Sequence, residues 1–240
     1  MSATAESILG FLEAVARERS ARAASPTLLR RVQAVKVYQQ RRFSHTYADL
    51  LATPRYGGAA RFFLEELYGP GDFRQRDAQF ARVVPALVRL FPYDVVETVN
   101  TLAQLHALSE SLDSEMARHL VDDRVDADSY IAAWQQTGRT EQRDMQIELT
   151  LSVGRSLDEL TRKPLLRHTL RMMRGPARAA GLAALQEFLE RGFDTFLAMR
   201  GAKEFLALVS AREHLLMDTL FDEETVTHGA AHTNALGQLP

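Results

Sequence analysis

A short aromatic stretch of the chain carries two adjacent acids that could do chemistry. Residues 62–68 read Phe-Phe-Leu-Glu-Glu-Leu-Tyr. On a helix with 100° between residues, Arg61 and Glu65 lie four residues apart on one face, as in an exposed ion pair. Glu66 falls beside Phe62, on the side that is expected to face the protein. A buried carboxylate must be paired, hydrogen-bonded or protonated, so Glu66 predicts a buried polar partner.

The segment that follows repeats this pattern with an aspartate. Asp77 lies in an apolar stripe, four residues after Phe73 and three before Phe80. Arg74 and Arg76 flank it, and an arginine can bind a carboxylate through two parallel hydrogen bonds. We therefore expect Asp77 to be buried and paired with an arginine, and Glu66 to share these arginines.

A third group of polar residues lies on one face of the long helix expected over 93–120. His106, Ser109 and Asp113 share this face with the apolar residues Val99 and Met116. A core histidine that is simply hydrogen-bonded gives the same pattern. Taken with the two preceding segments, this face completes a candidate buried polar cluster of Glu66, Arg74, Arg76, Asp77, His106 and Asp113.

Two interpretations of this cluster remain open. Arginine–carboxylate pairs without a cavity would hold helices together and favour a structural or interaction role. A cavity lined by Glu66, Asp77, His106 and Asp113 would favour ligand binding or catalysis, because perturbed titratable groups in a bundle core often mark a site. The two interpretations differ in one visible feature, the presence of that cavity.

The sequence contains no diagnostic catalytic or metal-binding motif. It lacks the Glu-x-x-His pairs of di-iron bundles, the His-Glu-x-x-His of zinc proteases, the Gly-x-Ser-x-Gly of hydrolases and any glycine-rich phosphate loop. The spacing of the histidines predicts no metal site. We therefore expect no cofactor, with haem bound through His106 as the alternative.

The elements that must position the cluster are predicted to be helices throughout. Alternating strand patterns are missing, and Ala, Leu, Arg and Glu dominate. Helix start signals include Ser25-Pro26, a capping serine followed by proline. We predict an all-α, multi-helix bundle of about eight to nine helices in one domain over 1–224. Its helical subregions cover about 1–121 and 126–224, and a disordered tail covers 225–240.

Composition narrows the classes of function. The 240 residues include no cysteine, which excludes disulfide scaffolds, thiolate metal sites and cysteine nucleophiles. The net charge of −2 gives no field that would recruit nucleic acid. No window is apolar enough for a membrane span, and no signal peptide is visible, so a cytoplasmic location is expected. The large apolar helix surface is compatible with a homo-oligomer.

The stretch Phe62 to Tyr68 also carries a family resemblance. The sequence resembles an uncharacterised bacterial family named for the FFLEELY motif. The continuation through Gly69-Pro70 and Arg76-Asp77, and the later run from Arg174 to Phe193, fit the same pattern. The resemblance covers about 25–215. It implies a bacterial protein of unassigned function and supplies no catalytic residues.

The sequence therefore favours a non-enzymatic protein that binds a partner or a small ligand between its helices. The alternative is a small-molecule enzyme or a haem-binding protein that uses the buried acidic and histidine cluster. Neither interpretation identifies the ligand, the substrate or the partner.

Overall fold

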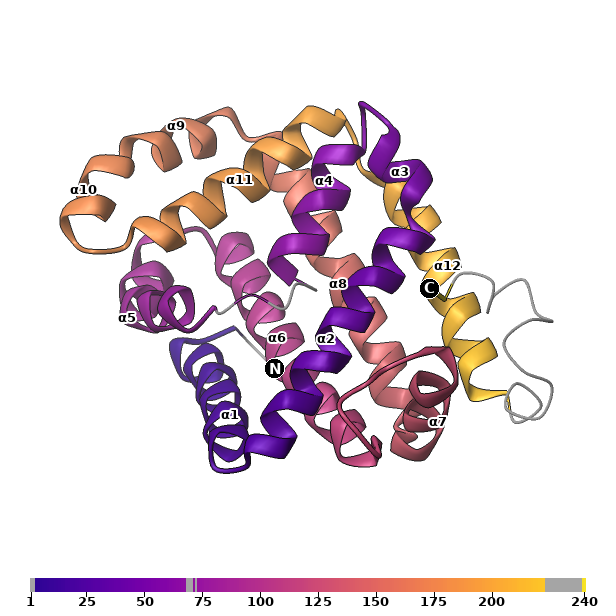
Figure 1. Ribbon diagram of the computed structural model, residues 1–240. Coiled ribbons are helices and arrows are strands. Elements are labelled where there is room, and N and C mark those ends of the chain that lie inside the picture. Colours follow the sequence, from indigo (N-terminus) through magenta and orange to yellow (C-terminus); the bar gives the residue numbers. More distant parts are fainter. Residues whose placement is uncertain (1–2, 68–70, 72, 223–238) are drawn as a thin grey trace.

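The structure is a computed structural model that describes residues 3–67, 71, 73–222 and 239–240. The described residues form helices and no strands (Figure 1). In chain order the elements are α1 (Ala5–Ala23), α2 (Pro26–Thr46), α3 (Ala48–Ala52), α4 (Gly57–Phe62), η1 (Phe63–Leu67), α5 (Arg74–Leu90), α6 (Tyr93–His119), α7 (Ala127–Thr137), α8 (Thr140–Thr161), α9 (Pro164–Met172), α10 (Arg174–Ala179), α11 (Ala183–Met199) and α12 (Lys203–Phe221). The predicted all-α class is confirmed.

The long helix α6 is the centre of this arrangement. It packs against α1 and α2 on the N-terminal side of the chain and against α7 and α8 on the C-terminal side. Helix α8 in turn packs against α11 and α12. In Figure 1, α9, α10 and α11 extend over one end of the bundle. The polar face predicted on α6 therefore lies among elements from both predicted subregions.

Several helix starts follow the local signals in the sequence. Thr4 caps α1 and Asp126 caps α7, each in a reciprocal pair of hydrogen bonds with a serine three residues later. Ser25 caps α2, whose first residue is Pro26. These starts are readable because a side-chain oxygen satisfies backbone N–H groups that have no partner inside the helix.

The prediction of about eight to nine helices is too low. The helix that begins at Pro26 ends at Thr46, and the separate helix α3 begins directly after Tyr47. Gly175 and Pro176 lie inside the short helix α10. A proline fits the first turn of a helix, so Pro176 does not interrupt α10. The chain is therefore divided into more and shorter helices than its hydrophobic pattern indicates.

The aromatic stretch with the two glutamates is not a regular α-helix. Residues Phe63–Leu67 form the π-helical turn η1 at the end of α4. A π-turn bonds each residue to the fifth one along the chain, so its side chains do not keep the 100° spacing of an α-helix. Phe62 lies against Gly192 of α11, where a Cβ atom would come within 2.9 Å of the phenyl Cζ. This close contact positions the start of η1 against α11.

Three groups of buried apolar residues form the core. One joins α2, α6, α7 and α12 around Tyr38 and Trp134. A second joins α2, α4, η1, α8, α11 and α12 around Phe63 and Phe196. The third joins α1, α5, α6 and α11 and contains Ile8, Leu12, Phe80, Val84, Val96, Val99, Ala103 and Leu185. We call this third group the α1–α5–α6 cluster.

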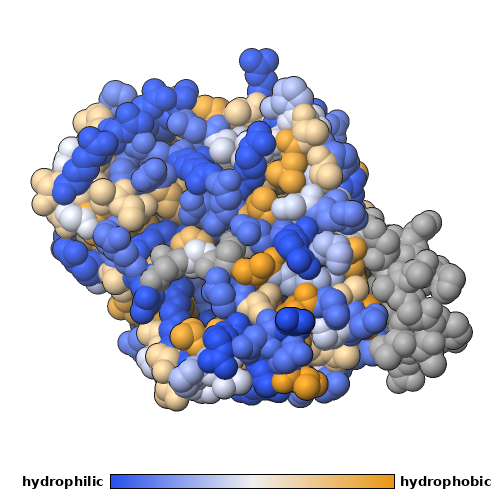
Figure 2. All heavy atoms as spheres, viewed as in Figure 1, coloured by the Kyte–Doolittle hydropathy of each residue, from blue (hydrophilic) through white to orange (hydrophobic). Residues whose placement is uncertain are grey.

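The surface in the view of Figure 2 is mostly hydrophilic, with apolar residues in small separate groups. None of the helices in the described part of the chain is both long and apolar enough to cross a bilayer. Of the predicted tail over 225–240, residues 225–238 lie outside the described residues. Leu239 is buried in the cluster around Tyr38, and the Tyr38 hydroxyl donates a hydrogen bond to the carbonyl of Pro240.

Candidate functional site

A cavity of about 80 Å³ lies between α1, α2, η1, α5, α6, α8 and α11. Half of its lining is apolar and comes largely from the α1–α5–α6 cluster, with Phe73, Leu102, Leu105, Phe188 and Leu189 beside it. The other half is polar and comprises Lys36, Gln39, Glu66, Arg76, Asp77, His106, Ser109, Glu110, Asp113 and Gln146. The polar faces predicted on three separate segments therefore meet at one cavity.

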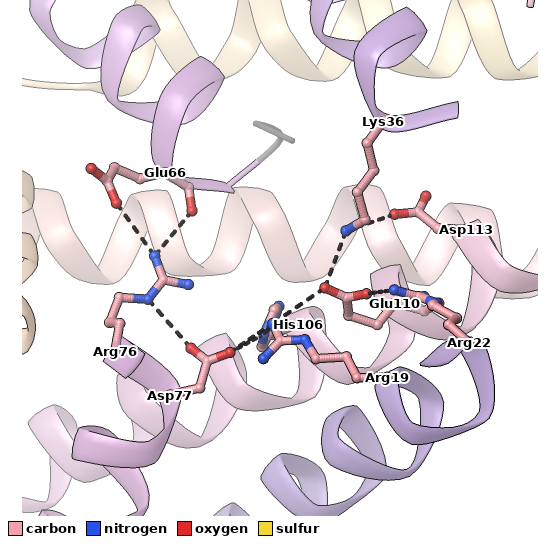
Figure 3. A network of polar contacts seen from close by, with 9 residues as sticks. All are labelled: Arg19, Arg22, Lys36, Glu66, Arg76, Asp77, His106, Glu110 and Asp113. Carbon is pink, nitrogen blue, oxygen red and sulfur yellow. Dashed lines mark hydrogen bonds and ion pairs between the residues drawn. The ribbon is translucent and has the colours of Figure 1, made fainter. Parts of the chain in front are cut away.

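Asp77 of α5 is the centre of one half of the polar network (Figure 3). Its Oδ2 atom lies 2.8 Å from Arg19 Nη2 of α1 and 2.9 Å from His106 Nε2 of α6. Its Oδ1 atom lies 3.3 Å from Nε of the neighbouring Arg76. Three helices thus converge on one largely buried carboxylate.

Glu66 connects this half of the network to α11. Its carboxylate oxygens lie 3.3 Å from Arg76 Nη1 and 2.9 Å from Arg191 Nη1 of α11. The guanidinium of Arg76 also stacks on two rings, with Cζ 4.1 Å from the centroid of Phe73 and 4.6 Å from that of Phe188. Cation–π contacts and the two carboxylates together fix the position of Arg76 at the cavity wall.

Glu110 of α6 is the centre of the other half. Its carboxylate binds Arg22 of α1 and lies 3.1 Å from Lys36 Nζ of α2. Lys36 Nζ lies in turn 3.2 Å from Asp113 Oδ2, and the Gln39 side-chain amide donates to Asp113 Oδ1 at 3.2 Å. Figure 3 shows the network continuing from Glu66 through Asp77 to Glu110, with His106 and Arg19 between.

The network lowers the pKa values of its central acids. Burial alone would raise the pKa of Glu110, but Lys36, Arg22 and His106 outweigh it and lower the pKa from 4.5 to about 2. Burial likewise opposes ionisation of Asp77, and the hydrogen bond and charge of His106, with Arg76 and Arg19, lower its pKa. Both carboxylates are therefore held as anions in the folded protein.

The lowered pKa of Glu110 predicts a loss of stability in acid. The folded pKa lies below the unfolded one, so the contribution is fully present above about pH 4.5 and disappears as the pH falls towards 2. A difference of this size corresponds to about 3 kcal/mol of unfolding free energy. Urea unfolding at pH 7 and pH 3 should show about 2 kcal/mol of this loss in the wild type, because part of it falls below pH 3, and a smaller loss in Glu110→Gln. An equal acid loss in both proteins would contradict the assignment.

Five of the six residues in the predicted cluster line the cavity: Glu66, Arg76, Asp77, His106 and Asp113. The sixth, Arg74, is an exposed residue at the start of α5 and does not line it. The carboxylate of Asp77 already contacts Arg76, Arg19 and His106, so it needs no further arginine. The membership of Arg74 in the cluster therefore stays a prediction.

The two glutamates of the aromatic stretch differ in exposure as expected. The ion-pair partner of Glu65, however, is not the expected one. The Glu65 side chain is 45% exposed and that of Glu66 is 19% exposed. Glu65 pairs with Arg191 of α11 and not with Arg61. The π-turn is the reason, because it changes the angle between residues 61 and 65 from that of an α-helix.

This difference predicts unequal effects of removing the two carboxylates. Glu66→Gln leaves Arg76 and Arg191 without a partially buried acid and should lower the unfolding free energy by about 1 to 2 kcal/mol. Glu65→Gln is the matched control, and its loss should stay below about 1 kcal/mol because exposed ion pairs contribute little. Chemical denaturation of both variants measures this difference, and equal effects would refute the separate roles.

Four further residues belong to the network and were not predicted from the sequence: Arg19, Arg22, Lys36 and Glu110. The sequence does contain a pattern that places Arg19 and Arg22. Ile8, Leu12 and Val15 form an apolar stripe with helical spacing. The same spacing continues to Arg19 and Arg22, which therefore face the protein. Glu110 lies on the edge of the polar face of α6, and its burial follows only from the position of α1.

The arrangement can bind a polar group and can move a proton. His106 and Asp77 form a hydrogen-bonded pair at the cavity wall, a geometry suited to acid–base chemistry. Ser109, Gln39 and Gln146 offer neutral hydrogen-bonding groups. In the described part of the chain, no group of three His, Asp or Glu side chains is arranged to hold a metal ion.

Comparison with known proteins gives a family but no function. Neither a curated protein nor a solved structure is significantly similar to the chain. The sequence model of one family, described as "Domain of unknown function (DUF8198)", matches residues 18–227. The match includes all the residues that line the cavity except Leu12 of α1. The chain therefore belongs to this uncharacterised family, whose function is unknown.

Proposed function

We propose that the protein binds a small molecule in the cavity beside α6 and that this molecule has a polar end and an apolar body. One observation carries the proposal. The polar network does not close on itself but borders a cavity of about 80 Å³, while one water needs roughly 10–15 Å³. Arginine–carboxylate pairs that only held helices together would need no such space.

The charges around the cavity indicate what the polar end carries. The network contains five carboxylates, Glu65, Glu66, Asp77, Glu110 and Asp113. Five cations oppose them, Arg19, Arg22, Lys36, Arg76 and Arg191. Five minus five leaves no net charge in the network. The charge of an ionic ligand would therefore not be balanced by an opposite charge of the protein. We infer that the ligand is neutral or zwitterionic.

The apolar part of the wall limits the rest of the ligand. Phe80, Val99, Ala103 and Leu185 come from the α1–α5–α6 cluster and cannot satisfy a polar group. An aliphatic or aromatic body that contacts them would gain free energy from burial in the usual way. The ligand is therefore expected to contact His106, Ser109 or Asp113 with one end and this cluster with the other.

A second candidate function is catalysis on the bound molecule. His106 Nε2 lies 2.9 Å from Asp77 Oδ2. A neutral imidazole that donates from Nε2 to Asp77 keeps Nδ1 as a proton acceptor. His106→Asn should leave the ligand bound but unchanged, whereas the wild type would convert it. Recovery of the same ligand mass from both proteins would favour binding without catalysis.

Haem is a less well supported occupant. Nε2 of His106 already contacts Asp77, and Arg19 Nη2 lies 3.3 Å from the same nitrogen. An axial ligand would have to give up the bond to Asp77 and leave that carboxylate with less compensation. An absorbance spectrum after reconstitution decides the question, since a haem site gives a Soret band.

Native mass spectrometry of protein purified from its own host tests the proposed function. The wild type should carry a non-covalent adduct above the 26.9 kDa chain. Leu102 lines the cavity, so Leu102→Trp should fill the space and remove the adduct. Leu102→Met conserves volume and should retain it. An adduct of equal abundance on all three proteins would show that the molecule binds elsewhere.

The finer assignment of the family is also part of this proposal. Phe62 to Tyr68 supports placing the chain in the bacterial family named for the FFLEELY motif. A cytoplasmic location is proposed with it. Self-association remains a prediction, and sedimentation analysis that finds only the 26.9 kDa monomer would refute it.

A further inference from the structure

The segment between α8 and α11 differs from the rest of the chain in charge. Residues 162–179 contain six Lys or Arg residues and no Asp or Glu. With these six removed from 29, 23 basic and 31 acidic residues remain and give the rest of the chain a balance of −8. The segment forms α9 and α10, which extend over one end of the bundle in Figure 1. We call residues 162–179 the basic arm, because positive charge is concentrated there.

The basic arm also exposes large apolar side chains. Leu165 is 81% exposed, Met172 is 66% exposed and Met173 is 43% exposed. Leu165 and Met172 are seven residues apart and therefore lie on the same face of α9. In Figure 2, apolar residues gather at the edge of the molecule where Figure 1 places α10. Single exposed apolar residues are common, but several on one face mark an interaction site.

The bundle covers only one edge of the apolar face of α9. This helix packs against α8, α10 and α11, and none of its described side chains is buried. At 100° per residue, its apolar residues span an arc of about 160°. Leu166 and Leu170 lie at one edge of this arc and are partly buried. Leu165 and Met172 lie at the other edge. The apolar face of α9 is therefore wider than docking on the bundle requires.

Four of the six cations of the basic arm are paired within the chain. The pairs are Arg162 with Asp158, Lys163 with Asp94, Arg167 with Asp194, and Arg174 with Glu190. Arg171 and Arg178 are exposed and form no ion pair with any described residue. Arg82 of α5 lies at the same end, where its Nη2 donates to the carbonyl of Ala180 at 3.3 Å, and the described residues offer it no acid either. Unpaired guanidinium groups therefore lie at the same end of the molecule as the exposed apolar residues.

A second copy of the chain is a poor partner for this face. A symmetric dimer places the same surface of each protein against the other, so Arg171 and Arg178 would face their own copies. Like charges across an interface oppose binding. The partner must instead be negatively charged and must accept apolar side chains at the same time. A bilayer surface with anionic phospholipids has both properties.

We propose that the basic arm binds the surface of a membrane that contains anionic phospholipids. Leu165, Met172 and Met173 enter the boundary between the headgroups and the acyl chains, as the apolar face of an interfacial helix does. Arg171 and Arg178 contact lipid phosphates, since a long arginine side chain can keep its charge at the headgroups while its stem lies on apolar surface. This contact is independent of the ligand proposed for the main cavity.

Cosedimentation of the full chain with lipid vesicles tests the proposal. The wild type should bind vesicles of phosphatidylcholine mixed with phosphatidylglycerol and should not bind vesicles of phosphatidylcholine alone. Added salt should weaken the binding, because it screens charges at an exposed surface. Absence of binding to the mixed vesicles, or equal binding to both kinds, would overturn the proposal.

Two pairs of variants locate the contact. Arg171→Glu combined with Arg178→Glu should lower the affinity for the mixed vesicles at least about tenfold, since each cation near an anionic surface contributes to binding. Arg17→Glu combined with Arg124→Glu changes the net charge equally at exposed sites outside the basic arm and should bind as the wild type does. Equal losses in the two double variants would refute a specific role of the arm.

The apolar contact has its own control. Leu165→Gln should weaken binding several-fold, whereas Leu215→Gln, at an exposed leucine of α12, should not. The chain has no cysteine, so Met172→Cys carries an environment-sensitive dye at one known place. Its emission should shift to the blue with the mixed vesicles, and a dye at Leu215→Cys should not respond.

Two further outcomes would assign the face to another partner and overturn the proposal. One is a dimer in sedimentation that Leu165→Gln abolishes, which would indicate a second copy of the chain. The other is binding to polyglutamate without binding to the mixed vesicles, which would indicate an acidic protein.

Discussion

Replacing Glu110 by alanine is expected to lower the unfolding free energy by about 3 to 5 kcal/mol. Glu110 is 3% exposed and its carboxylate contacts Arg22, Lys36 and Arg19. Removal of the acid leaves the buried Arg22 without its carboxylate, whereas Lys36 and Arg19 keep Asp113 and Asp77, and a stranded buried cation costs more than the ion pair itself contributes. Equilibrium urea denaturation measures the change.

Glu115→Ala is the matched control on the same helix. Glu115 pairs with Arg118 one turn away at the surface, so its loss should change stability by less than about 1 kcal/mol. A second substitution separates charge from packing. Arg22→Met in the Glu110→Ala background should recover part of the loss, because it removes one stranded cation. A loss below about 1 kcal/mol for Glu110→Ala would contradict the central place of this residue.

Phe63→Ala is expected to have a similar effect for a different reason. Phe63 is 2% exposed, and its ring lies 6.0 Å from that of Phe196 and 5.9 Å from that of Phe205. Truncation of a buried phenylalanine removes apolar contacts and leaves a cavity, which together cost about 3 to 5 kcal/mol. The π-turn would also lose its anchor to α11 and α12.

Phe63→Leu provides the graded comparison, with an expected loss of about 1 to 2 kcal/mol because most of the volume remains. Thermal and chemical unfolding of both variants would measure the difference. Equal losses would indicate that the backbone of η1, and not the ring of Phe63, fixes this element.

The sequence predicted the fold class and the polar faces because both depend on local periodicity. Asp77 and His106 interrupt apolar stripes on their own helices, and each one lines the cavity. The ion pairs that join these faces to other helices could not be predicted from local periodicity. Arg19 binds Asp77 across 58 positions of chain, and Arg22 binds Glu110 across 88. Nothing local to either arginine identifies its partner.

The aromatic stretch shows a second limit. The sequence placed Glu66 inward and Glu65 outward, and the exposed fractions agree. It also paired Glu65 with Arg61, which is wrong because η1 is a π-turn. A change of one residue in hydrogen-bond register leaves the hydrophobic pattern almost unchanged, so periodicity does not detect it. The cavity itself depends on how six helices and η1 meet, so no local sequence pattern predicts it.

The most direct test of the binding site is a high-resolution crystal structure of the protein purified from its own host. We expect density for an organic molecule in the main cavity, with its polar end near His106 and Asp113. Its apolar body should lie against Phe80 and Leu185. A cavity that contains only ordered water, or one filled by the side chain of Arg76, would contradict the account.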